Sequence, residues 1–267
     1  MDEKFNSKLL GRYLAANNCG ADIIFLDRTA STQEEAKRFA ELGGSTDAIF
    51  VAEEQYGGHG RNKRSWFSAA GLSLSFSILT HPDIPLFCVP FASYAASLAV
   101  RSVLRETGVN AEIKWPNDLL VNGRKICGII SESAAYASKL RYLATGFGIN
   151  VNNTASVFPD ELRSTAASVR IETGRSVSRE KLAAEITVKF TEFLKLLKDN
   201  PKSLLEIYRL HCTTLGKHVK IILENEELIG TAININNDGS LLIEKNGEKL
   251  SFFAADVIHL RNATQAC

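Results

Sequence analysis

The sequence has few cysteines, and they are not arranged as a metal site or a disulfide framework. The five cysteines lie at positions 19, 88, 127, 212 and 267, far apart and odd in number, and there is no C-x-x-C pair. Structural zinc sites and small disulfide-stapled domains both require characteristic cysteine spacings. We therefore predict no protein-held metal and a reducing, cytoplasmic location.

An excess of charge of one sign is also missing. The chain carries 31 Lys and Arg against 30 Asp and Glu, a formal net charge of +1. A protein without a global field can hold a polyanion only at a local basic patch, so we expect neither nucleic acid nor an anionic membrane as a partner. Arg12, Asp22 and Asp27 interrupt the apolar stretches near the start, which argues against a signal peptide. We predict that no segment approaches the roughly 20 apolar residues of a membrane span.

What is present is the composition of a folded globular protein. Of the 267 residues, 45% are hydrophobic and 23% are charged, values typical of soluble domains. From Gly216 onward, short apolar runs alternate with turn signals at 224–226, 237–239 and 246–247. We predict two domains: residues 1–213 and a small β-barrel of residues 214–267, with a final strand over 248–260.

A long cationic loop joins two predicted strands. "DAIFVAEEQ" indicates a strand that ends at Gln55, and the residues from 72 to 78 alternate between apolar side chains and serine, the period of a strand. Between them lies "YGGHGRNKRSW". Glycine permits close approach of the backbone and arginine makes bidentate contacts, so such a loop can wrap a phosphate. The alternative is a solvated basic turn.

Helices and further strands surround this loop. "STQEE" at 31–35 has the pattern of a capping box at a helix start. Helical spacing predicts helices over 86–107, 178–199 and 201–211. "AEIKWPNDLL", "RKICGII" and "LRYLATGFGINV" each read as a strand, the first two joined by Asn122-Gly123, a strong hairpin signal. These three strands predict an antiparallel meander.

Two polar motifs lie in this meander. Lys114, Asn117 and Asp118 surround a Trp-Pro step, where they could converge on a ligand or simply cap a turn. Lys125 begins an otherwise apolar strand. It could face a site, or its ammonium could reach solvent while its stem packs against the core.

The order of these motifs resembles the biotin protein ligase family. STQ is followed by Q-x-x-G-x-G-R-x-x-R-x-W-x-S, then K-W-P-N-D, R-K-x-x-G-I and G-x-G-I-N. The resemblance extends over residues 20–261. It implies an α+β fold in which a mixed β-sheet is flanked by helices, as in class II synthetases and lipoate ligases, followed by an SH3-like barrel at the C-terminus.

The resemblance also implies a reaction. Members of the family make biotinyl-5′-AMP from biotin and ATP with Mg²⁺, and then transfer biotin to one lysine of a biotin carboxyl carrier domain. A homodimer is possible. Because only about twenty residues precede the matching core, we do not expect an N-terminal DNA-binding domain. The alternatives are a lipoate or octanoate protein ligase and a catalytically weakened biotin-binding regulator.

Site residues follow by motif match. The residues expected to bind biotin are Ser31, Thr32, Gln33, Gln55, His59, Gly60, Arg61 and Lys125. Those expected around ATP or the adenylate are Gly58, Arg61, Arg64, Trp66, Lys114, Asn117 and Asn150. Those expected to be catalytic are Lys125, Asp118 and Arg61.

Three positions depart from the usual family pattern. His59 replaces the first arginine of the loop, and Lys63 stands where a small residue precedes the last one. Gln33 is one methylene longer than the usual asparagine. We therefore expect altered contacts in the phosphate loop and in the biotin pocket.

Overall fold

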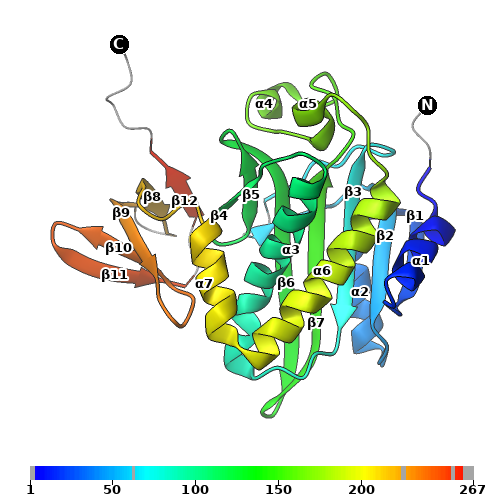
Figure 1. The fold of residues 1–267 in the computed structure, drawn as a ribbon, viewed down its shortest axis with the longest axis horizontal. Helices are drawn as coiled ribbons and strands as arrows, with labels where there is room; N and C mark the ends of the chain where they lie inside the picture. Colours follow the sequence, from blue (N-terminus) through cyan, green and yellow to red (C-terminus); the bar gives the residue numbers. More distant parts are fainter. Residues whose placement is uncertain (1–3, 62–63, 224–226, 254–255, 261–267) are drawn as a thin grey trace.

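A computed structural model describes residues 4–61, 64–223, 227–253 and 256–260. Its strands form two sheets (Figure 1). In spatial order the seven-stranded sheet contains β1 (Asp22–Thr29), β2 (Ala48–Gln55), β3 (Ser73–Thr80), β7 (Lys139–Asn150), β6 (Arg124–Tyr136), β5 (Asp118–Val121) and β4 (Glu112–Lys114). The five-stranded sheet contains β11 (Glu248–Phe252), β10 (Leu241–Lys245), β9 (Glu227–Ile235), β8 (His218–Ile222) and β12 (Asp256–His259).

The larger sheet is mixed, which agrees with the predicted α+β class. β1 and β2 run parallel, whereas every other neighbouring pair is antiparallel. The prediction of one strand over 111–120 was wrong. β4 ends at Lys114, the chain turns through residues 115–117, and Lys114 pairs with Asp118 at the start of β5. Pro116 has no N–H to donate to a ladder, which favours a turn there.

Helices cover the sheet on both faces. The helical elements are α1 (Ser7–Ala16), α2 (Thr32–Glu41), a 3₁₀ segment (Leu86–Phe91), α3 (Ala92–Glu106), α4 (Asp160–Arg163), α5 (Val169–Thr173), α6 (Arg179–Asp199) and α7 (Pro201–His211). In Figure 1, α3 and α6 cross one face, while α2 lies on the other. Ser178 caps α6 by accepting from the amide of Lys181, and Pro201 occupies the first turn of α7.

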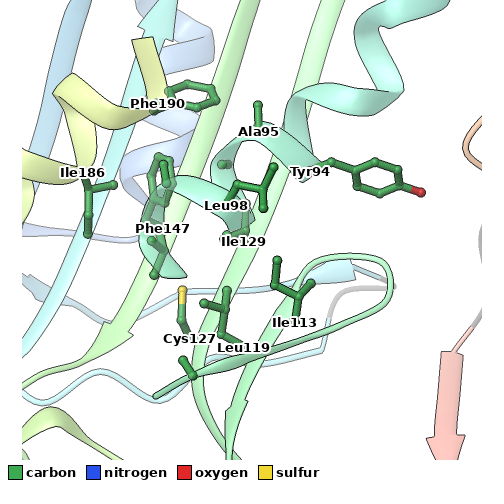
Figure 2. Packing of buried hydrophobic residues seen from close by; sticks show 14 of the residues in the cluster. Tyr94, Ala95, Leu98, Ile113, Leu119, Cys127, Ile129, Phe147, Ile186 and Phe190 are labelled. Carbon is green, nitrogen blue, oxygen red and sulfur yellow. The ribbon is translucent and has the colours of Figure 1, made fainter. Parts of the chain in front are cut away.

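The main core lies between the sheet and the α3–α6 layer (Figure 2). Leu98 from α3 and Phe190 from α6 approach Phe147 of β7. The Phe147 ring stacks on Phe76 at 4.7 Å between centroids and meets Phe190 edge-on at 5.7 Å. Such aromatic contacts add to the free energy of burying apolar area. This face of the sheet is therefore fully packed.

One segment contradicts the expectation that no stretch is apolar and long enough for a membrane span. Within the described residues, Leu86–Glu106 meets that criterion by length and composition, but 61% of its apolar 18-residue window is buried inside the fold. It forms the 3₁₀ segment and α3 of the main core. A core helix accounts for its composition.

The smaller sheet is antiparallel and packs against α3 and α7. The predicted final strand over 248–260 is in fact two strands, β11 and β12, and β12 pairs with β8 on the far side of the sheet. The Tyr94 hydroxyl donates to the carbonyl of Gly239 at 2.6 Å, and Arg209 donates to the carbonyl of Ile235. The predicted turn at 224–226 lies outside the described residues. The domain boundary at 213/214 stays a prediction.

Candidate active site

A cavity of about 170 Å³ lies on the face of the large sheet opposite α3 and α6. The predicted site residues that line it are Ser31, Thr32, Gln33, Gln55, His59, Gly60, Arg61, Arg64, Trp66, Lys114, Asn117, Asp118 and Lys125. They come from the start of α2, the cationic loop, the β4–β5 turn and the start of β6. Segments almost 100 residues apart in the chain thus meet at one concave surface.

Strand alternation explains why this face is open. On β3 the apolar residues Leu74, Phe76 and Ile78 belong to the main core, and the intervening serines point to the opposite face. The whole strand is buried, serines included. On β7 the residues in register with these serines include Gly146 and Gly148. Small side chains on this face leave room for a ligand.

The glycines on this face are required by close neighbours. A Cβ at Gly146 would lie 2.7 Å from Gln33 Oε1, and one at Gly148 would lie 2.5 Å from the Trp66 ring. A Cβ at Gly128 of β6 would lie 3.2 Å from the same ring and 3.4 Å from Lys125 Nζ. The side chains of Gln33, Trp66 and Lys125 therefore lie in this order over Gly146, Gly148 and Gly128, which we call the glycine strip.

A β-bulge directs Lys125 into the cavity. Counting by twos from Cys127 and Ile129, both in the main core, would place Lys125 in the core as well. The register of β5 against β6 shifts between Leu119 and Leu120, so Cys127 pairs with Leu119 but Lys125 pairs with Leu120. The extra residue is Ile126, which is fully buried. Bulges commonly reorient a side chain beside a site.

Lys125 makes an ion pair with Asp118, and both residues line the cavity. Its Nζ lies 2.7 Å from Asp118 Oδ1 and 5.5 Å from the centroid of the Trp66 ring. Both charged side chains are partly exposed, at 39% for Lys125 and 25% for Asp118. A cation and a carboxylate in direct contact can separate when an anionic substrate offers the cation a second partner.

The start of α2 differs from the predicted capping box. Ser31 is the N-cap residue, but its side chain makes no cap hydrogen bond. The Thr32 amide and hydroxyl instead donate to Gln55 Oε1 at 2.9 and 3.2 Å, and the Thr32 hydroxyl also contacts Ser77 Oγ at 2.9 Å. Gln55 therefore binds the helix start in place of a cap, while Ser31 and Thr32 both line the cavity.

Gln33 leaves one buried polar atom without a partner. Its Nε2 donates to the carbonyl of Ala144 and to Glu132 Oε2, each at 3.0 Å. Its Oε1 and the Nε1 of Trp66 are the two buried side-chain polar atoms that lack a hydrogen bond within the described residues. Buried polar atoms without a partner are costly and rare. Here an acceptor and a donor both occur in residues of the same cavity.

The cationic loop folds back on itself as a short hairpin. Trp66 donates its amide to the carbonyl of Gly58, and Gly60 donates to the carbonyl of Arg64, both at 2.8 Å. His59 lies 3.7 Å from Glu34 Oε1 on α2. Lys63 lies outside the described residues. The hairpin places Trp66 on the glycine strip and Arg61 at the cavity wall.

Comparison with known proteins decides the family. Residues 25–150 match the biotin/lipoate A/B protein ligase family, and residues 214–260 match the biotin protein ligase C-terminal domain. The bifunctional ligase/repressor BirA of Bacillus subtilis is 31% identical over 240 residues, covering 89% of this chain and 74% of that protein. This chain belongs to the biotin protein ligase family.

Two further relatives cover nearly the whole ligase chain. The biotin–[acetyl-CoA-carboxylase] ligase of Mycobacterium tuberculosis is 28% identical, over 98% of this chain and 96% of that one. The structure of the Aquifex aeolicus biotin protein ligase in complex with biotin and ATP superposes with a TM-score of 0.75 at 27% identity, covering 90% of this chain and 99% of that one. The predicted fold class is confirmed.

Two of the predicted ligase site residues do not line the cavity. Gly58 is buried, and a Cβ there would lie 2.5 Å from Nε2 of Gln55, which does line the cavity. Asn150 donates to the carbonyls of Ala167 and Lys125, at 3.0 and 3.4 Å, and so joins the end of β7 to the segment beside β6.

Sequence reasoning also missed several lining residues. They are Ser65, Ser77, Trp115, Pro116, Gly128, Ile129, Ile130, Gly146, Phe147, Gly148, Val257 and Ile258. The G-x-G spacing and the serine alternation were visible signals for Gly146, Gly148 and Ser77. Val257 and Ile258 belong to β12 of the small sheet, and their sequence carried no such signal.

The small sheet is fixed to the ligase site through Thr214. The Thr214 hydroxyl oxygen accepts from the amide of Trp115 at 3.0 Å and lies 3.0 Å from His259 Nε2. Burial, followed by the charges of Lys217 and Lys114, lowers the pKa of His259 to about 4. A neutral imidazole at pH 7 can accept the hydroxyl proton of Thr214.

Proposed function

We propose that this chain is an ATP-dependent biotin–protein ligase. The supporting observation is the order of groups along the glycine strip: an unpaired carboxamide oxygen at Gln33, the indole of Trp66, and the ammonium of Lys125 beside Asp118. Biotin has a ureido ring with N–H donors at one end and a carboxylate at the other. Ser31, Thr32, Gln33 and Gln55 suit the ring, and Lys125 suits the carboxylate.

In the first half-reaction, a biotin carboxylate oxygen attacks the α-phosphorus of ATP. The new P–O bond forms as the bond to the bridging oxygen of pyrophosphate breaks. Negative charge moves from the attacking carboxylate to the phosphate oxygens and the departing pyrophosphate, where Lys125 and the guanidinium and amide of Arg61 can act as preorganised donors. Arg64, Lys114 and Asn117 would contact the nucleotide.

In the second half-reaction, the amine of the acceptor lysine attacks the acyl carbon of biotinyl-5′-AMP and AMP leaves. A lysine ammonium has a pKa of about 10.4 in water, so it must lose a proton to react at pH 7. Asp118 lines the cavity, and we assign it the role of receiving the amine and accepting that proton. His59 and Gly58 would shape the loop around the acyl-phosphate.

Magnesium would arrive with the nucleotide. Within the described residues no three His, Cys, Asp or Glu side chains are grouped as a metal site. Mg²⁺ commonly keeps waters and binds substrate phosphates with one or two carboxylates, so this site fits a nucleotide-held ion. The ion would supply charge neutralisation at the phosphates.

Relatives named as ligases of acetyl-CoA carboxylase support a biotin carboxyl carrier domain as the acceptor. We propose this domain as the protein partner, a cytoplasmic location and a possible homodimer. We propose neither nucleic acid nor membrane as a partner, because a formal net charge of +1 gives the chain no global field to hold a polyanion.

Exchange of labelled pyrophosphate into ATP tests the activity. The expected result is exchange that depends on biotin and is not supported by lipoate or octanoate. Exchange with lipoate or octanoate instead would identify an enzyme of the related attachment reaction. Binding of biotin without any exchange would identify a binding regulator, and either result would overturn the proposal.

A further inference from the structure

The side chain of Gln33 is held in one orientation by two acceptors. Its Nε2 donates to Ala144 O and to Glu132 Oε2. If the carboxamide were flipped, its oxygen would face two other oxygens and no donor. The environment therefore directs Oε1 toward Gly146 and the cavity, where this atom, in a side chain only 4% exposed, has no partner.

Glu132 is itself held by a cation. Its Oε1 accepts from Lys37 Nζ at 3.0 Å, and Lys37 also pairs with Glu34 at 3.0 Å. Burial disfavours the Lys37 ammonium, but the hydrogen bonds to Glu132 and Glu34 outweigh this, so the pKa of Lys37 is raised. The two oxygens of one carboxylate thus accept from two donors, Lys37 on one side and Gln33 on the other.

We propose that Glu132 is a positioning and specificity-determining residue that acts through Gln33. The Lys37–Glu132–Gln33 relay presents a fixed acceptor to the ligand, so the site selects an acid whose far end carries an N–H donor. An acyl chain without such a donor would leave Oε1 unpaired, and sites built around a buried polar group reject such analogues strongly. The inference rests on the proposed function, because it takes biotin as the ligand.

The isosteric change Glu132→Gln distinguishes this role from simple packing. A carboxylate offers two acceptor oxygens, whereas a carboxamide offers only one. The Lys37 ammonium would donate to that one oxygen, and the NH₂ group of the substituted residue 132 would face Gln33 Nε2, which is also a donor. Gln33 must then flip or lose a hydrogen bond, and the acceptor in the cavity is lost.

Biotin affinity of the full chain, measured by calorimetry without ATP, tests the relay. We expect E132Q to raise the biotin Kd on the order of tenfold, the effect of losing one well-placed hydrogen bond. In a Gln33→Ala background, the same change should have no further effect, because the group through which it acts is gone. Adding Lys37→Met to E132Q should recover most of the affinity, since the carboxamide can then turn its oxygen to Gln33.

Glu35→Gln is the matched control. Glu35 lies on α2, the helix that carries Gln33 and Lys37. It pairs with Arg38, accepts a hydrogen bond from the Thr29 hydroxyl, and does not line the cavity. Its biotin Kd should stay at the wild-type value. An unchanged Kd in E132Q, an equal loss in the Gln33→Ala background, or no recovery with Lys37→Met would overturn the relay. Wild-type protein that neither binds biotin nor exchanges pyrophosphate would instead overturn the proposed function, and the relay with it.

Discussion

The two faces of the seven-stranded sheet have opposite character. One face carries Phe76, Phe147 and their neighbours packed against α3 and α6, in a continuous apolar core. The other carries serine and glycine on the same strands, with α2 over one part and a cavity over the rest. A single strand such as β7 contributes alternate residues to each face. Stability and ligand binding can therefore be altered separately by substitutions one residue apart.

The packed face of the sheet allows the cavity face to hold polar atoms that lack a partner. Rigid strands fixed by the packed face can support Gln33 and Trp66, although Gln33 Oε1 and Trp66 Nε1 have no hydrogen-bond partner among the described residues. The free energy cost is offset by the core behind them. A ligand that supplies the missing donor and acceptor then gains the full benefit of a preorganised site.

The largest effect is expected on the packed face. Phe76→Ala should lower the free energy of unfolding by about 3–5 kcal/mol, because it opens a cavity in a fully buried aromatic stack. Denaturant titration measures the loss. Ser75→Ala on the other face, which removes a contact with Ser68, should cost about 1 kcal/mol. Equal losses at the two positions would contradict the separation of the faces.

The next effect concerns catalysis. Lys125→Ala should raise the activation free energy of biotinyl-5′-AMP formation by about 2–4 kcal/mol, because a preorganised charge at the cavity is lost. The fold should be kept. Single-turnover adenylation measures it. Arg124→Ala is the control, since Arg124 pairs with Glu172 outside the cavity. A wild-type rate in K125A would mean that Lys125 only packs beside the strand.

A smaller effect is expected from the glycine strip. Gly148→Ala places a methyl group 2.5 Å from the Trp66 ring, and such overpacking costs about 1–3 kcal/mol. The indole should be displaced, which a shift in tryptophan emission and weaker biotin binding would report. Gly20→Ala is the control, because a Cβ there meets nothing within 4 Å. An unchanged emission spectrum in G148A would argue against the packing of the Trp66 indole on Gly148.

The smallest effect is on pH dependence at the junction with the small sheet. The pKa of His259 in the fold is about 4, below the value of about 6.5 expected when unfolded. The unfolded state therefore binds more protons between these values, and this contribution to stability falls as pH drops from about 6.5 to about 4. His259→Gln should flatten the fall in melting temperature between about pH 6.5 and 5. Parallel curves would exclude this role.

Several features of the fold could be read from the sequence because their causes are local. Alternation of serine with apolar residues determined β3, Asn122-Gly123 determined a hairpin with positive φ at both residues, and Ser178 and Pro201 marked helix starts. The family resemblance rested on motif order and was confirmed by the comparisons. The site roles of individual residues stay predictions.

Other features depended on contacts across the fold. The bulge at Ile126 exists only in the register of β5 against β6, and it decides that Lys125 faces the cavity. Gln33 is oriented by Ala144 and Glu132, about a hundred residues away, and β12 reaches the cavity from the other sheet. The sequence by itself determined which chemical groups are available and which local structures form, because these follow from neighbouring residues. Only the tertiary structure decided which groups meet and which way they point, because that depends on register and packing between distant segments.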